Sequence, residues 1–339
     1  MREDKKTVTA TTAATAATAT PTGYWYYVGL YLMFNLALTL FNKAVLDDLP
    51  YPYTLTAVHA ASNVIGCTIA RLYGLYTPAK LSTTEIVILI FFSTLYTINI
   101  AVSNLSLSLV TVPVHQVGIR LFIGVNLTIA QIIRSLGPLF TMALAVPILG
   151  SKFSIPKLVS LLPVIAGIAL TTYGEISFTA LGLFLTFAGT ILAAFKTVVT
   201  NLMQTGQRFQ MHPLDLLHWL SPLALAQCIA YAVYTGEYFE VYKDLWPMHN
   251  VYKTILVIAL NGALAFGLNV VSFVSNKKVG PLTISVAANI KQVLTVVLSF
   301  FFFELSVSQV GFVGIVLALL GGLWYGRVEY NDKKRALTL

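Results

Sequence analysis

The chain has 339 residues, of which 57% are hydrophobic and only 10% are charged, and its formal net charge is +8. A mean hydropathy of +0.79 excludes a soluble globular protein, because so few polar residues cannot cover an apolar core. Apolar runs of about 20 residues recur along the chain and favour membrane-spanning helices over a β-barrel, whose strands alternate in period two. We therefore expect an all-α integral membrane protein with no soluble domain.

The first residues form a Thr/Ala tract, MREDKKTVTATTAATAATATPTG, that has no apolar core. It matches neither a secretory signal nor an Arg-rich transit peptide, so residues 1–23 are predicted to be a disordered cytosolic tail. Cys67 and Cys228 lie in separate apolar runs without other metal ligands nearby, which favours small packing residues over a disulfide or a zinc site. No cofactor or metal is expected.

Ten membrane spans are predicted, and the distribution of basic residues tests their number, since Lys and Arg collect in the cytosolic loops. The spans cover residues 24–46, 53–73, 84–106, 110–149, 155–173, 178–202, 213–235, 252–275, 280–303 and 306–327. With the fourth stretch crossing once, the basic residues gather on the side of both termini: Arg2, Lys5, Lys6, Arg71, Lys80, Lys152, Lys157, Arg208, Lys277, Lys278, Arg327, Lys333, Lys334 and Arg335.

The opposite side receives Lys243 and Lys253 and is otherwise acidic. Its acids are Asp47, Asp48, Glu175, Glu237, Glu240, Asp244 and Glu304. Two crossings by the fourth stretch would move every later loop to the other side and destroy this asymmetry. Both termini are therefore predicted to be cytosolic.

A weak internal repeat divides the chain into two five-helix halves. The fifth span ends LPVIAGIALTTYG and the tenth ends VLALLGGLWYG, and each follows a span with one embedded cation, Arg134 or Lys291. Because five is odd, the halves must have opposite topology, which is the inverted-repeat plan of secondary transporters. The predicted domain is 24–330, in two inverted halves, with a cytosolic tail at 331–339.

Five cations are embedded in apolar runs that contain almost no acids: Lys43, Arg120, Arg134, Lys196 and Lys291. Each costs about 2.5–3.5 kcal/mol to insert, so an anionic ligand is the natural partner, and a Lys/Arg cluster suits a phosphate ester. Lys43 lies one turn from Asp47 and can snorkel to the membrane surface, and Lys196 near its span end can do the same.

Lys291 lies at the middle of its predicted span, where snorkelling is much harder, so it is the strongest candidate for a binding site. Lys277 and Lys278 are interpreted as charges that set the topology. Several polar residues could line the same cavity, although hydrogen bonds between helices explain each of them equally well. They are Asn99, Ser103, Asn269, Asn289 and Gln292.

Several segments resemble the triose-phosphate translocator family of the drug/metabolite transporter superfamily, near its fungal branch and related to nucleotide-sugar transporters. The segments are NLALTLFNKAVL, YPYTLTAVH, YTINIAVSNLSLSLVTVPVHQ, KTVVTN, NKKVGPLT and NIKQVLTVV. The resemblance covers residues 24–330. It implies ten helices in two inverted halves and exchange of a phosphorylated solute for phosphate or a nucleoside monophosphate.

The resemblance also implies site residues. Plastid members hold the phosphate with a lysine of the fourth helix and a Lys-Arg pair of the ninth, and these positions fall on Arg134, Lys291 and Gln292. Lys196 falls on a cavity-facing arginine of the sixth helix. Ser103 and Leu268 fall on hydroxyl-bearing contact positions of the third and eighth helices.

Two departures from the family pattern affect the expected substrate. Gln292 removes a charge and Leu268 removes a phenol hydroxyl, so the plastid substrate set does not transfer to this chain. A changed or larger substrate, such as a nucleotide sugar, becomes plausible. Asn269 and Asn289 are expected to tune specificity together with Gln292.

The resulting hypothesis is an alternating-access antiporter for an organic phosphate, located in the Golgi or endoplasmic reticulum membrane. Its expected partners are this small molecule and membrane lipid, with no nucleic acid, and a homodimer stays open. Two alternatives are kept. One is a transferase acting on lipid phosphates, which usually needs acidic metal-binding pairs or a His/Asp base, and the other is a membrane scaffold without transport.

The fourth stretch is too long for one span, because a 40-residue helix would measure about 60 Å against a bilayer core of roughly 30 Å. Relatives run directly from His-Gln to a basic residue, and removing Val117–Gln131 restores VTVPVHQIIRSLGPLF. These fifteen residues correspond to an in-frame length, a valine codon begins with GT, and a glutamine codon can end in AG. We interpret the segment, which contains Arg120, as a retained short intron, and a genuine insertion is the alternative.

Sequencing of the transcripts tests this interpretation. We expect messages that join the codon of Gln116 directly to that of Ile132. If every transcript retains the segment and its deletion abolishes transport, the insertion is genuine.

Overall fold

The computed structural model describes residues 21–79, 81–110, 128–171, 180–206, 210–245, 251–303 and 309–338. The regular secondary structure of these residues is entirely α-helical. The helices are α2 (Pro21–Asp48), α3 (Pro52–Leu72), α4 (Thr83–Val110), α5 (Thr128–Ser135), α6 (Gly137–Leu149), α7 (Ile155–Val159), α8 (Leu161–Thr171), α9 (Ala180–Thr205), α10 (Pro213–Tyr234), α11 (Glu237–Leu245), α12 (Val251–Val279), α13 (Pro281–Phe303) and α14 (Gln309–Thr338).

Six stretches in the described part of the chain are long and apolar enough to cross a membrane. They are Gly23–Leu46, Ile132–Leu149, Phe184–Thr205, Pro213–Tyr234, Val251–Val279 and Gln309–Arg335. These correspond to the first, fourth, sixth, seventh, eighth and tenth predicted spans. The remaining four predicted spans coincide with α3, α4, the pair α7 and α8, and α13, and their crossing of the membrane stays a prediction.

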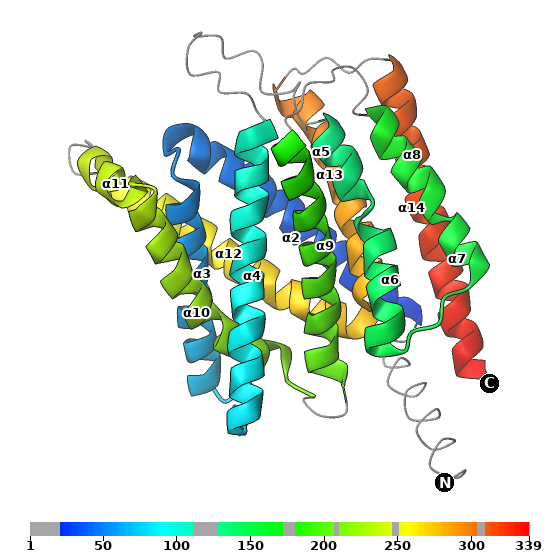
Figure 1. Ribbon diagram of the computed structural model, residues 1–339, viewed down its shortest axis with the longest axis horizontal. Helices are drawn as coiled ribbons and strands as arrows, with labels where there is room; N and C mark the ends of the chain where they lie inside the picture. The colour runs from blue at the N-terminus through cyan, green and yellow to red at the C-terminus, as the bar shows by residue number, and fades with distance from the viewer. Residues whose placement is uncertain are drawn as a thin grey trace.

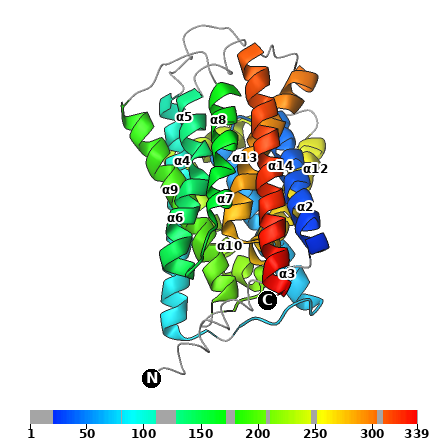
Figure 2. The ribbon, with the colours of Figure 1, turned by 90° about the vertical axis from the view of Figure 1, so that its right-hand side faces the viewer.

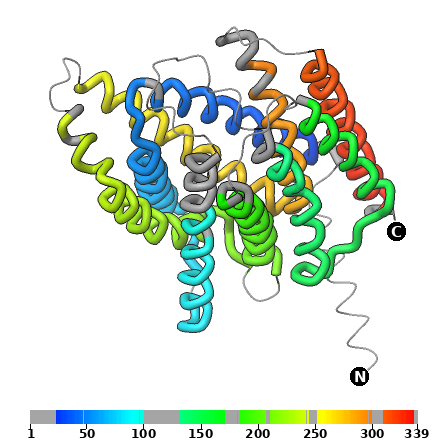
Figure 3. The backbone as a smooth tube through the Cα atoms, turned by 45° about the horizontal axis from the view of Figure 1, so that its top comes forward, coloured from blue at the N-terminus to red at the C-terminus, as the bar shows by residue number. Residues whose placement is uncertain are grey.

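The helices form one bundle in which α3 and α10 pack together at one end and α8 and α14 at the other (Figures 1 and 3). Helices α2, α4, α9, α12 and α13 lie between these two pairs. Figure 2 shows α8 and α14 running side by side along the height of the bundle. Helix α2 begins and α14 ends at the same end of the bundle (Figure 1).

Small residues bring the backbones of α8 and α14 into close contact. A Cβ atom at Gly167 would lie 2.4 Å from the Ala318 backbone nitrogen, and one at Gly321 would lie 2.8 Å from that of Val164. The earlier residue of one helix thus faces the later residue of the other, so the two helices are antiparallel. Close approach of small residues is the usual means of packing helices in lipid, where helices gain little hydrophobic energy from association.

Buried amides join α12 to its neighbours. His59 Nε2 of α3 lies 2.6 Å from Asn261 Oδ1, and Asn261 Nδ2 donates to Asn42 Oδ1 of α2 at 2.9 Å. Asn261 is fully buried. Because an unpaired amide in this environment is costly, these bonds fix the register of three helices.

The start of α3 is capped from another part of the chain. Glu237, the first residue of α11, accepts hydrogen bonds from the backbone nitrogens of Tyr53 and Thr54 at 3.3 and 2.9 Å. Negative charge at a helix N-terminus is favourable, since the first amides have no partner within the helix.

The fourth predicted span is built from two short helices. Residues 111–127, which include Arg120 and most of the predicted insert, lie outside the described residues. The last four residues of the insert belong to α5, which ends at Ser135, and α6 begins at Gly137 with Pro138 next to it. Arg134 therefore lies in the last turn of α5, next to a break in the helix.

An ion cluster lies where α7 meets the last part of α14. Lys157 pairs with Glu329, and the Glu329 carboxylate also lies 3.6 Å from Lys333 Nζ. The side chains of Lys157 and Glu329 are only 11% and 6% exposed. The distribution of charge along the sequence predicts both lysines only as topology charges and gives Glu329 no role.

Replacing Glu329 by Leu should lower the thermal stability of the detergent-solubilised protein, because Lys157 is left buried without its carboxylate. Breaking a buried pair typically costs about 3–5 kcal/mol, whereas replacing both partners by apolar residues is often neutral. Thermal unfolding should therefore show that Lys157→Met/Glu329→Leu recovers most of the loss. The exposed Glu240→Leu serves as the control, and equal stability of the single and double variants would contradict the pairing.

Candidate functional site

A cavity of about 260 Å³ lies between α2, α5, α6, α9 and α13. The break between α5 and α6 borders this cavity, and residues of α9 and α13 form most of its wall. The lining residues are Tyr31, Arg134, Gly137, Thr186, Gly189, Thr190, Ala193, Ala194, Thr197, Ile284, Ser285, Ala288, Asn289 and Gln292. Three residues of the predicted site, Arg134, Asn289 and Gln292, are therefore brought together.

Hydrogen bonds hold α13 against the α5–α6 break. Asn289 Nδ2 donates to the Ser135 carbonyl at 2.8 Å, and Ser285 Oγ lies 3.1 Å from Thr141 Oγ1, which itself donates to the Gly137 carbonyl. Asn289 is 2% exposed, and Ser135 is fully buried. A carbonyl at the end of a short helix has no partner within that helix, so the Asn289 amide satisfies it and positions the neighbouring Arg134.

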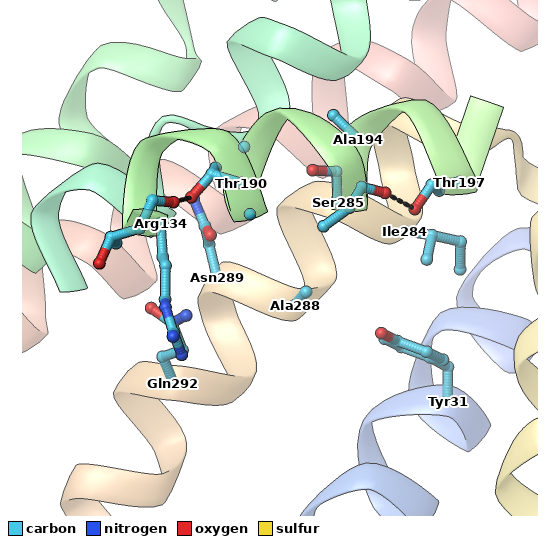
Figure 4. A pocket seen from close by; sticks show the side chains of 14 residues that line it. Tyr31, Arg134, Thr190, Ala194, Thr197, Ile284, Ser285, Ala288, Asn289 and Gln292 are labelled. Carbon is cyan, nitrogen blue, oxygen red and sulfur yellow. Dashed lines mark hydrogen bonds between the residues drawn. The ribbon is translucent and has the colours of Figure 1, made fainter. Parts of the chain in front are cut away.

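The side chains of Arg134 and Gln292 lie near one another at one end of the cavity. In Figure 4 the Arg134 side chain extends from α5 toward Gln292 of α13, and Asn289 lies beside Thr190 of α9. Gln292 Oε1 is buried and has no hydrogen-bond partner among the described residues. This end of the cavity thus combines a guanidinium group with polar amides.

Lys291 does not line the cavity itself, but it lies close to this end. It follows Ile284 by two turns on the same side of α13, and Ile284 is a lining residue. The positive charges of Lys291 and Arg134 are within electrostatic range of each other. No hydrogen bond or ion pair joins Lys291 Nζ to a described residue, so this ammonium group can take an anion as its partner.

Lys196, Asn269 and Leu268 are not among the residues that line the cavity. Lys196 lies in α9 next to Thr197 but is absent from the lining. Asn269 donates to Asn63 Oδ1 at 3.2 Å, so a hydrogen bond between α12 and α3 accounts for it. Leu268 is also absent from the lining. Ser103 belongs to α4, but its side chain lies outside what the structure describes.

Asn99 has a similar role to Asn269. Its side-chain amide donates to the carbonyl of Gly189 in α9 at 2.8 Å. The bond joins α4 to the helix that forms one wall of the cavity. Hydrogen bonds between helices, the alternative to a role in lining the cavity, therefore account for both asparagines.

Sequence reasoning missed the hydroxyl groups of the cavity, which belong to Tyr31, Thr186, Thr190, Thr197 and Ser285. A signal for three of them exists in α9. Thr186, Thr190 and Thr197 are separated by four and seven residues, a spacing that places them on one face of a helix. These hydroxyl groups are neutral, so the pattern of embedded charges does not indicate them.

The profile of the Triose-phosphate Transporter family matches residues 22–326 of the chain. The chain belongs to this family. The resemblance found in the sequence is therefore confirmed, and it extends over all the helices that form the cavity. Because the family's members are transporters, the protein is not an enzyme, and the transferase alternative is excluded.

Individual relatives are distant but cover most of the chain. A chloroplastic phosphoenolpyruvate/phosphate translocator of Oryza sativa is 26% identical over 92% of this chain and 74% of its own length. A probable sugar phosphate/phosphate translocator of Arabidopsis thaliana is 22% identical over 91% and 84%. A chloroplastic triose phosphate/phosphate translocator of Flaveria pringlei is 24% identical over 99% and 81%.

A solved crystal structure shares the fold. It aligns with a TM-score of 0.63 at 13% sequence identity, over 89% of this chain and 96% of the other. At this identity the match concerns the fold alone. The helical bundle is thus an arrangement that another protein also adopts.

Proposed function

We propose that the protein is a secondary antiporter that exchanges a phosphorylated organic solute for phosphate or a nucleoside monophosphate by alternating access. The observation that carries this proposal is the cavity with Arg134 in its wall and Lys291 nearby. Two cations at one end of a cavity between apolar helices suit a phosphate group. The relatives' names, which specify phosphate exchange with phosphorylated solutes, support the same activity.

The predicted ten spans in two inverted halves form part of the proposal. The halves pair α2 with α9, α3 with α10, α4 with α12, α5–α6 with α13, and α7–α8 with α14. If each helix is replaced by its counterpart in the other half, the contact of α4 with α9 corresponds to that of α12 with α2. The contact of α6 with α9 corresponds in the same way to that of α13 with α2. All four contacts are present, and the antiparallel packing of α8 and α14 agrees with opposite orientations of the halves.

Exchange, rather than one-way transport, follows from the cost of moving embedded positive charge through the membrane without a bound anion. An embedded cation costs about 2.5–3.5 kcal/mol, and two cations near each other also repel. A bound anion offsets both costs. Conformational switching with an anion bound is therefore favoured over switching while the cavity is empty, which gives coupled exchange.

The size of the cavity bears on the substrate. At about 260 Å³ it lies just below the usual 300–1,000 Å³ of small-molecule sites. This favours a compact phosphate ester over the larger nucleotide sugar. We keep the Golgi or endoplasmic reticulum and the cytosolic termini as predictions, which a fluorescent fusion combined with protease protection would test.

Replacing Lys291 by Ala should abolish exchange, because the phosphate loses one of its two cations. Counterflow of labelled phosphate in proteoliposomes measures the effect. Thermal stability in detergent should be unchanged or higher, since an embedded charge is removed. The exposed Lys253→Ala is the matched control for loss of a lysine. Undiminished counterflow by Lys291→Ala would contradict the assignment.

Replacing Gln292 by Arg should shift preference toward inorganic phosphate and triose phosphates and away from bulkier substrates. A charge about 4 Å from the phosphate contributes on the order of 4 kcal/mol at an effective dielectric constant near 20, and desolvation offsets much of this. Competition by a panel of organic phosphates for phosphate uptake measures the preference. An unchanged ranking would show that Gln292 does not contact the substrate.

A further inference from the structure

We infer that Thr190 and Thr197 of α9, together with Gln292, determine substrate specificity by presenting hydrogen-bond acceptors to the cavity. The wall they form selects organic phosphates whose organic part carries hydroxyl groups. It discriminates against those that carry a second acidic group and no hydroxyl. This inference rests on the proposed function, because it concerns the same cavity and the same transport cycle.

The two threonines have already used their only protons. Thr190 Oγ1 donates to the Thr186 carbonyl at 2.7 Å, and Thr197 Oγ1 donates to the Ala193 carbonyl at 2.8 Å (Figure 4). A hydroxyl has one proton and two lone pairs, so each of these oxygens can only accept from a ligand. Both residues line the cavity.

Gln292 adds a third acceptor. Its Oε1 atom is buried and has no hydrogen-bond partner among the described residues. A buried acceptor without a donor costs about 1–3 kcal/mol, so the cavity favours a ligand that brings donors. Ser285 uses its proton toward Thr141, whose own proton goes to the Gly137 carbonyl, so the Ser285 oxygen can also accept from the same ligand.

The acceptors lie along the cavity from its cationic end. In Figure 4, Arg134, Asn289 and Gln292 occupy one end, Thr190 lies beside Asn289, and Thr197 lies at the other end near Ile284. A phosphate held by Arg134 would therefore direct its organic part along α9 toward Thr197. The hydroxyls of that part would meet the threonine oxygens.

Two compact phosphate esters show what this arrangement selects. Glycerol 3-phosphate has two hydroxyl groups that can donate to threonine oxygens. Phosphoenolpyruvate at neutral pH has no hydroxyl, and its carboxylate would place negative charge against oxygen acceptors. A carboxylate there needs a second cation, but the residue next to Lys291 is the neutral Gln292.

The test is exchange in proteoliposomes loaded with phosphate, with either ester supplied outside. We expect the wild type to have a higher kcat/KM for glycerol 3-phosphate than for phosphoenolpyruvate. Thr190→Val and Thr197→Val, which keep the side-chain shape and remove the acceptor, should each lower this ratio about fivefold, the factor that one net hydrogen bond contributes. Thr190→Ser and Thr197→Ser keep the hydroxyl and should retain the ratio.

Thr205→Val is the matched control. Thr205 also lies in α9 and donates to a carbonyl four residues earlier, that of Asn201, but it does not line the cavity. Its ratio should equal that of the wild type. Phosphate/phosphate exchange, measured for every variant, reports whether the carrier is folded and active.

The outcomes separate the inference from the function on which it rests. A wild type that exchanges neither phosphate nor either ester overturns the proposed antiport. A wild type that exchanges phosphate but prefers phosphoenolpyruvate overturns the specificity inference alone. The specificity inference is also overturned if valine variants that still exchange phosphate keep the wild-type ratio of kcat/KM for the two esters. If a valine variant loses phosphate exchange, its ratio is not used. The inference is then tested by the wild-type ratio and by the serine variants, and a serine variant that loses the wild-type ratio overturns it.

Discussion

The need to stabilise positive charge within an apolar helix bundle governs this structure. Lys157 and Lys291 satisfy it differently. Lys157 is paired with Glu329 inside the protein, where α7 meets α14. Lys291 forms no such pair with a described residue, and it lies near Arg134 beside a cavity. A cation with a permanent partner supports the fold, whereas a cation such as Lys291 can take a partner from solution, which is the physical basis of an anion carrier.

Much of the fold follows from apolar length and the distribution of charge. These signals predict the helices, including the fourth span, whose α5 and α6 are separated only at Leu136. They also identify Arg134, because a charge at that depth in an apolar run is rarely without a role. Gln292 and Asn289 were found through their positions beside Lys291 on the same helix, together with the family resemblance.

The rest of the site depends on which face of each helix meets the cavity. Asn269 and Asn289 look equivalent in sequence, yet one bonds to Asn63 between α12 and α3 and the other bonds to Ser135 beside Arg134. Tertiary packing decides between such roles, and charge patterns do not report it. The α9 threonines were not predicted for another reason. A neutral hydroxyl costs little in an apolar helix, so its presence does not indicate a ligand until the cavity is known.

The close contact of α8 with α14 has a mechanical consequence. Packed helices shear by moving side chains between alternative interlocking positions. Where Gly167 meets Ala318 and Gly321 meets Val164, backbone lies almost directly on backbone, and few side-chain rearrangements are available to permit sliding. These two helices, one from each of the two proposed halves, therefore move as one rigid unit at the edge of the bundle. Any change in access to the cavity must be taken up by the helices that surround it.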